Sequence, residues 1–189
     1  MKNILKSTLL LMCGAFILAS CADDNDSNPV LQKPTKFVLN TPALATNGTY
    51  DLANSSTVEF TCTQPDYGFP ITTKYTIEVA TKADMSNATT MSNSFKTAKM
   101  QVDAAEMAAA LTEQAIKEGK TEADFPIDIP VYVRAKATPL TAMGSEIDSL
   151  NHSYAIQSNI VALKHVHLAF SLPPVNLPEH IYITGNFNN

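Results

Sequence analysis

The stretch "IDIPVYVRAKAT", residues 127–138, carries the strongest strand signal in the chain. Ile129, Val131 and Val133 alternate with polar or amphipathic residues such as Arg134. Successive side chains of a strand point to opposite faces of its sheet, so a period of two gives one apolar face. The stretch therefore predicts a β-strand.

Shorter stretches of the same kind lie on both sides of this one. Turn signals separate them, including Asn47-Gly48 and the loop "PDYGFP" at residues 65–70. Strands at such spacing predict an all-β protein built as an antiparallel sandwich. The further strands are expected in residues 35–42 (ended by Pro42), 56–65, 73–81, 89–95 (the weakest, expected at a sheet edge) and 153–164.

One helix is expected to interrupt the strands, in "DAAEMAAALTEQAIKEG" at residues 103–119. Asp103 lies three residues before Glu106, as in a capping box, and Gly119 is a natural helix stop. We expect a packing helix that covers one flank of the sandwich and protects a sheet edge. The apolar stripe consists of Ala104, Met107, Ala108, Leu111 and Ala115.

The N-terminus has the pattern of an export signal. Lys2 and Lys6 precede an apolar or small-residue run that ends in "FILASCADDND", residues 16–26. The apolar core from Leu9 to Ala19 is shorter than the roughly 18 to 20 residues that a membrane span needs. We therefore expect a signal peptide at residues 1–20.

The end of this signal, Leu18-Ala19-Ser20-Cys21, resembles the lipobox of bacterial lipoproteins. The resemblance implies cleavage between Ser20 and Cys21 and attachment of a diacylglyceryl group to the Cys21 thiol. Two or more acyl chains anchor a protein stably, so the membrane would be a partner through this lipid. The alternative is an ordinary secretory signal with a cysteine nearby by chance.

Residues 21–33 are acidic, polar and proline-containing, and they predict a flexible tether. Asp23, Asp24 and Asp26 resemble the acidic signal that sends lipoproteins of the Bacteroidota to the outer face of the outer membrane. The alternative is a solvated linker that has no targeting role.

Charge and cysteine content limit the possible partners and chemistry. The net charge of −5 becomes more negative when the signal lysines are removed, which argues against nucleic acid and anionic lipid headgroups as partners. Of the three cysteines, Cys13 lies in the signal and Cys21 carries the lipid. Cys62 then stands alone, and its place on the apolar face of residues 56–65 predicts a buried small residue rather than a nucleophile.

Three stretches, residues 74–88, 131–138 and 158–164, resemble the N-terminal domain of the SusE/SusF group. These are outer-membrane lipoproteins of starch-utilisation systems. The resemblance covers residues 34–164 and implies an immunoglobulin-like, fibronectin type III-like domain. In that family the first domain is a spacer, and starch-binding β-domains follow it.

The end of the chain fits the same order of domains. Residues 165–189 are expected to be a linker and an incomplete second β-domain, because "IYITGNFNN" at 181–189 looks like the opening of that family's glycan-binding domains. We expect the chain to be truncated there. Starch or another glycan would then be bound through modules absent from this chain.

Candidate sites within the chain are few. The chain has no tryptophan, and Tyr67 and Phe69 are the only loop aromatics close together, so they are weak candidates for stacking on a sugar. Such a pair more often caps a turn against the core. His165 and His167 could share a strand face, but no further ligand accompanies them, so no metal or other cofactor is expected.

These patterns together predict a non-catalytic surface lipoprotein of a starch-like polysaccharide utilisation system. No catalytic frame or phosphate loop is found. The expected location is the outer membrane, lipid-anchored at the cell surface, with a SusC/SusD-type transport complex as a candidate partner. The alternative is a cell-surface protein-interaction or adhesion module with a fibronectin-like sandwich.

Overall fold

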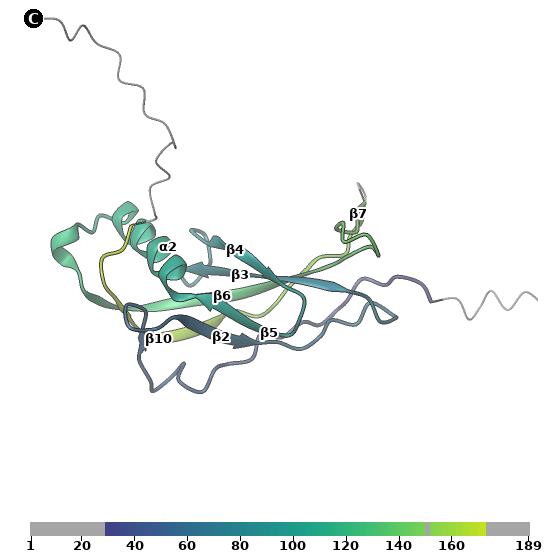
Figure 1. The fold of residues 1–189 in the computed structure, drawn as a ribbon, viewed down its shortest axis with the longest axis horizontal. Coiled ribbons are helices and arrows are strands. Elements are labelled where there is room, and N and C mark those ends of the chain that lie inside the picture. The colour runs from purple at the N-terminus through teal and green to yellow at the C-terminus, as the bar shows by residue number, and fades with distance from the viewer. Residues whose placement is uncertain (1–28, 150–151, 173–189) are drawn as a thin grey trace, which may run out of the picture. The chain divides into compact units, whose positions relative to one another are not determined.

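The structure is a computed structural model that describes residues 29–149 and 152–172. One compact unit begins at Gln32 and contains every helix and strand of the described residues (Figure 1). In chain order the elements are β1 (Tyr50–Asp51), β2 (Thr57–Thr61), β3 (Thr73–Ala80), β4 (Thr89–Phe95), β5 (Lys99–Asp103), α2 (Ala104–Lys117), the 3-10 helix η2 (Glu122–Asp124), β6 (Ile127–Pro139), β7 (Asp148–Ser149), β8 (His152–Ser153), β9 (Ile156–Gln157) and β10 (Val161–Leu168).

The larger sheet has the strand order β1-β10-β6-β3-β4, and β9 pairs with β6 beside this path. Its strand pairs are antiparallel except for β1 and β10, which run parallel with Tyr50 opposite Val166. Strand β4 forms one edge of the sheet, as the weak pattern of residues 89–95 predicts. The sheet is therefore mixed, and the prediction of a purely antiparallel arrangement is wrong at β1.

A smaller sheet pairs β2 with β5, and a separate short pair joins β7 to β8. Phe60 and Met100 of the smaller sheet share one buried core with Ile77 and Val133 of the larger sheet. The fold is mostly β with one helix: a curled mixed sheet plus a small two-stranded sheet. It is not clearly the immunoglobulin-like sandwich that the sequence predicts, because the second layer has only two strands.

Strand β6, which contains the predicted strand at 127–138, lies between β10 and β3 in the larger sheet. Val131 and Val133 are buried, whereas Arg134 is half-buried on the other face, which confirms the predicted alternation. The Arg134 Nε and Nη2 atoms both donate to Glu78 Oε2 of β3, at 2.8 and 2.5 Å. This pair links the solvent-facing sides of two neighbouring strands.

Helix α2 begins and ends as predicted. The Asp103 side chain accepts a hydrogen bond from the Glu106 N–H at 2.8 Å, and Gly119 follows the helix with a φ of 98°. The whole predicted stripe is buried. The helix contacts β2 and β5 of the smaller sheet as well as β3, β4 and β10 of the larger one, so it connects the two sheets rather than covering one flank.

Two strand predictions differ from the structure, and the five-residue strand β5 was not predicted. Residues 35–42 form no strand but a single bridge between Leu39 and Cys62. Residues 153–164 form β9 and the start of β10, with a break between them. Strand β5 was not predicted, because its five residues directly precede the helix and look like part of its start. Strand β10 also continues to Leu168, past residue 164.

Within residues 29–149 and 152–172, no helix combines the length and the apolar character that crossing a membrane requires.

Candidate functional site

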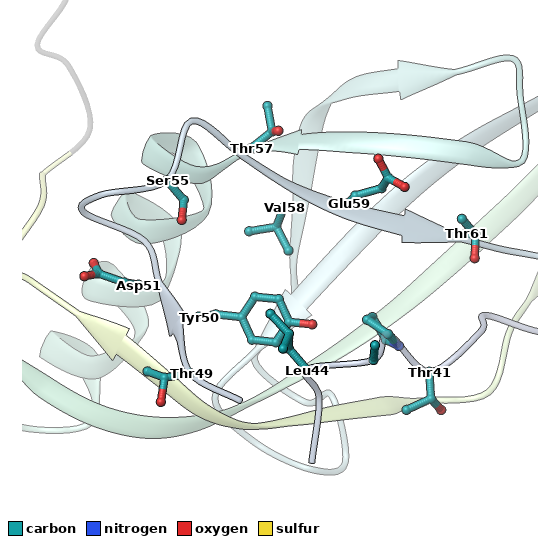
Figure 2. A pocket seen from close by; sticks show the side chains of 12 residues that line it. Thr41, Leu44, Thr49, Tyr50, Asp51, Ser55, Thr57, Val58, Glu59 and Thr61 are labelled. Carbon is teal, nitrogen blue, oxygen red and sulfur yellow. The ribbon is translucent and has the colours of Figure 1, made fainter. Parts of the chain in front are cut away.

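The main candidate site is a groove of about 540 Å³ between β2 and the segment 41–51 (Figure 2). Figure 2 shows Leu44 and Tyr50 on one side of the groove and Val58 and Glu59 on the other. Hydroxyl, carboxylate and apolar side chains all contribute to its walls. The lining residues are Thr41, Pro42, Ala43, Leu44, Thr49, Tyr50, Asp51, Ser55, Thr57, Val58, Glu59 and Thr61.

The groove exists because pairing along β2 stops halfway. Segment 38–40 runs beside the end of β2, where the Asn40 N–H donates to the Thr61 carbonyl at 2.9 Å. Pro42 has no N–H to continue the ladder, and the chain turns away at this point. The first half of β2 is therefore left without a neighbour on this side.

The segment that turns away forms a compact wall. Hydrogen bonds from the Ala45 N–H to the Pro42 carbonyl and from the Gly48 N–H to the Leu44 carbonyl, both 3.0 Å, close the turn. The Lys164 N–H of β10 donates to the Ala45 carbonyl at 2.9 Å and holds the turn against the larger sheet. A Cβ at Gly48 would lie 2.7 Å from the Leu44 side chain, so glycine allows this close approach.

Two carboxylates line the groove. Asp51 Oδ1 accepts from the backbone N–H groups of Ala53 and Asn54, and its Oδ2 accepts from Asn54 Nδ2 at 2.7 Å. The Asn54 side-chain bond is the main cause that lowers the pKa of Asp51. Glu59 lies 2.9 Å from Lys99 Nζ on β5, and this hydrogen bond lowers the pKa of Glu59. Both groups are therefore charged at neutral pH.

Tyr50 is the aromatic residue of the groove. Its side chain is partly buried, and this burial raises its pKa. In Figure 2 the ring lies beside Leu44 and below Val58. The ring therefore contributes apolar surface to the floor of the groove.

The two aromatics predicted as weak sugar-stacking candidates lie elsewhere. Tyr67 is 1% exposed, and its burial raises its pKa to about 12. A ring in this position offers no face to a sugar, because stacking needs an accessible ring. Phe69 is half-buried in the same loop. The structure thus places Tyr67 in the core, as a cap on the turn, and leaves only Phe69 partly accessible.

Cys62 is a buried free thiol, 7% exposed. Burial raises its pKa to about 11, so the thiol is protonated at neutral pH and a poor nucleophile. The prediction of a small buried residue is confirmed.

The two histidines lie in β10, on either side of buried Val166. His167 Nδ1 is 2.9 Å from Asp128 Oδ1, whereas His165 is exposed. Within the part of the chain that the structure describes, no group of three or more histidine, cysteine, aspartate or glutamate side chains is arranged to hold a metal ion.

Five predicted site residues lie outside the described residues: Ser20 and Cys21 at the signal cleavage site and Asp23, Asp24 and Asp26 in the export signal. The predicted start of a second β-domain at 181–189 also lies outside them. The groove beside β2 was not predicted. Pro42 was recognised as the end of a strand, but the sequence does not tell which neighbouring strand loses its partner there.

Comparison with protein families finds a match to the model described as SusE outer membrane protein, over residues 23–136. The matched range begins in the acidic segment and ends within β6, so it includes both walls of the groove. No solved structure matches the chain.

Proposed function

Because this chain belongs to the SusE outer membrane protein family, we propose that it is a non-catalytic, lipid-anchored surface protein of a starch-like polysaccharide utilisation system. Family membership implies an outer membrane protein of a Sus system. In our proposal the β-domain is a spacer that supports glycan-binding modules, and the sugar contacts are made by modules other than residues 32–172.

The family match over residues 23–136 is the observation on which this proposal rests. SusE proteins are generally non-catalytic binding proteins. The spacer role is supported by the burial of Tyr67 and by the partial burial of Tyr50 and Phe69, since sugar-stacking sites present open aromatic faces.

We further propose that the two sheets are the layers of a modified immunoglobulin-like, fibronectin type III-like sandwich. The shared core of Phe60, Met100, Ile77 and Val133 supports this assignment. The domain would run from residue 34 to Leu168, because β10 continues past residue 164. A crystal structure with the two sheets about 10 Å apart and roughly aligned would agree with a sandwich, and an orthogonal packing would contradict it.

The lipid anchor and the export signal are tested in cells. Cys21→Ser should abolish labelling with radioactive palmitate and leave the precursor uncleaved, because serine cannot take the thioether-linked lipid. Replacement of Asp23, Asp24 and Asp26 by alanine should keep the label but protect the protein from protease added to intact cells. Labelling of the Cys21→Ser chain, or unchanged protease cleavage of the alanine variant, would refute the respective assignment.

The spacer role is tested by calorimetric titration of the full chain with maltoheptaose. We expect no saturable binding heat, and the same result for Phe69→Ala and Tyr50→Ala. Tyr132→Ala, on the opposite face of the larger sheet from the core, is the control. Saturable binding that Phe69→Ala or Tyr50→Ala abolishes would disprove the spacer role and locate a sugar site on this domain.

The alternative function is protein interaction or adhesion, and the unpaired part of β2 favours it as a second candidate. A tagged chain purified from outer membranes should bring a SusC/SusD-type transport complex with it if it works within a Sus system. Recovery of an unrelated surface protein in its place, in stoichiometric amount, would favour the adhesive role.

A further inference from the structure

We propose that the groove beside β2 is a docking site for an extended, basic segment of another protein, which adds to β2 as a further strand. This inference goes beyond the spacer role. It depends on the backbone of β2, on the apolar wall opposite, and on the charge of the groove.

The backbone of β2 has a free edge on the groove side. The Ser56 carbonyl accepts from the Ala104 N–H and the Cys62 N–H donates to the Ala98 carbonyl, at 3.1 and 2.9 Å. Hydrogen-bonding direction alternates along a strand, so residues 58 and 60 also face β5, whereas Thr57 and Glu59 face the groove. Among the described residues, none hydrogen-bonds to the backbone of Thr57 or Glu59 on this side.

This edge has only part of the protection that exposed strand edges usually have. Natural edges are short, carry charged residues or proline, are bulged, or are covered by other segments. The free part of β2 is short and carries Glu59, but it has no lysine, proline or bulge. The half of β2 that faces the groove reads Thr57-Val58-Glu59 and is regular in its pairing with β5. Strand β4, at one edge of the larger sheet, differs: its Ser92 N–H donates to Glu106 Oε1 of the helix at 2.5 Å. An added strand therefore fits β2 better than β4.

The opposite wall offers apolar contacts to an incoming strand. Leu44 is 54% exposed, a high value for a leucine that the turn at 42–48 holds in place. Tyr50 lies beside it (Figure 2). Strand addition combines main-chain hydrogen bonds with pockets for alternate side chains, and Leu44 and Tyr50 would receive one such side chain.

The charge of the groove selects the partner. Its charged lining residues are Asp51 and Glu59, and no lysine, arginine or histidine is among the lining residues. Lys99 of β5 pairs with Glu59 from outside the groove, but both side chains are exposed and such a pair contributes little, so Glu59 can also bind a cation of an incoming segment. A segment with lysine or arginine complements these carboxylates. A second copy of this chain is a poor occupant, because its own β2 edge would bring another Glu59 to the same place.

A sugar chain fits the groove less well than a peptide. Tyr50 is partly buried, so only part of its ring is available for stacking. The free N–H and C=O groups of Thr57 and Glu59 are spaced about 6.8 Å apart, two residues along a strand, which is the spacing that a peptide backbone matches.

The first experiment tests the free edge itself. Hydrogen exchange of the full chain, in micelles of a detergent without a sugar headgroup, should show fast exchange at the amides of Thr57 and Glu59. The amides of Val58 and Phe60, which face β5, should exchange at least tenfold more slowly. Equal protection at all four amides would mean that the edge is already paired and would overturn the proposal.

The second experiment measures binding by fluorescence polarisation with three labelled peptides. The probes are Thr-Lys-Val-Lys-Val-Lys-Thr, the same peptide with glutamate in place of lysine, and the lysine peptide N-methylated at alternate residues. We expect the lysine peptide to bind at least tenfold more tightly than either of the others. It should also slow exchange at Thr57 and Glu59.

Matched variants locate the binding. Glu59→Lys should reverse the preference toward the glutamate peptide, and Leu44→Ser should weaken binding at least threefold. Glu113→Lys, an equal charge reversal on the exposed face of α2, should change nothing. All three side chains are exposed, so the variants are expected to fold, and circular dichroism checks this.

Several results would overturn the proposal. Absence of binding by any of the peptides would do so, as would equal binding of the N-methylated peptide, which cannot pair with the edge. Displacement of the lysine peptide by maltoheptaose would assign the groove to a sugar, and dimerisation of the chain that Glu59→Lys abolishes would assign it to a second copy. The calorimetric titration with maltoheptaose tests the spacer role independently of these results.

Discussion

Tyr67 shows how a single buried polar atom limits the stability of the domain. Its hydroxyl is buried, and no described residue hydrogen-bonds to it. An unpaired buried hydroxyl costs about 1 to 3 kcal/mol, so Tyr67→Phe should leave stability unchanged or raise it by about 1 kcal/mol. Urea denaturation measures this. A clear loss of stability in Tyr67→Phe would show that the hydroxyl has a partner.

The raised pKa of Cys62 predicts how the free energy of unfolding changes at alkaline pH. Its pKa is about 11 in the folded chain against a usual 9.0, so the unfolded thiol ionises first. The free energy of unfolding therefore keeps its full value below pH 9 and falls as pH rises toward 11, on the order of 2 kcal/mol from this group. Cys62→Ala should remove this part of the pH dependence while adding a constant packing loss. Parallel profiles for the two proteins between pH 9 and 11 would contradict the assignment.

The side chain of Asn159 takes the place of a strand partner for the backbone of Leu39. Its Oδ1 accepts from the Leu39 N–H at 3.0 Å, and its Nδ2 donates to the Leu39 carbonyl at 3.1 Å. These two bonds hold segment 37–40 against the larger sheet, while Leu39 also bridges to Cys62. Asn159→Ala leaves both Leu39 groups unpaired and should cost about 2 to 4 kcal/mol. Faster hydrogen exchange at Leu39 should accompany the loss.

Asn93→Ala provides the matched control, because Asn93 is an exposed amide in edge strand β4. It should change the free energy of unfolding by less than about 0.5 kcal/mol. Equal effects of the two substitutions would mean that segment 37–40 does not depend on Asn159.

The elements with local signals were predictable, and those that depend on distant contacts were not. Helix α2 and strand β6 carry their periodicity and caps within the sequence. Strand β5 and the bridge at Leu39 are short, and they form because Phe60 and Cys62, far along the chain, present a partner. The groove belongs to the second kind, since it is the place where such pairing ends. No periodicity marks an edge that stays unpaired.

The family match indicates the system in which the protein works, whereas the structure shows a groove that the family motifs do not reveal. The match to the SusE outer membrane protein family covers residues 23–136 and places the chain in a Sus system. The family could be identified from the sequence because its short motifs lie largely within strands β3 and β6, whose signals are local. The groove follows from the geometry of β2, so the domain that we propose as a spacer can carry the proposed docking surface without any change in the motifs that identify the family.

The whole domain should also have a defined acid limit. Several exposed carboxyl groups have a lowered pKa, because Asp84 and Asp124 accept hydrogen bonds from Ser86 and Thr121, and Glu146 accepts one from Lys74. Groups with a lowered pKa stabilise the fold above their unfolded values, near 3.8 for aspartate and 4.5 for glutamate, and this stability is lost as pH falls further. The melting temperature should therefore be level between pH 5 and 8 and fall below about pH 4.5.

Salt separates the two kinds of carboxyl group. Added sodium chloride should weaken the contribution of the exposed ion pair between Glu146 and Lys74, because salt screens such pairs. The local turn bonds of Asp84 and Asp124 should respond much less. Glu146→Gln should therefore lose most of its difference from the unmodified chain in 1 M salt, whereas Asp124→Asn should keep it. A melting temperature that rises steadily from pH 5 to pH 3 would contradict the predicted acid limit, because it would require the folded chain to bind more protons than the unfolded one.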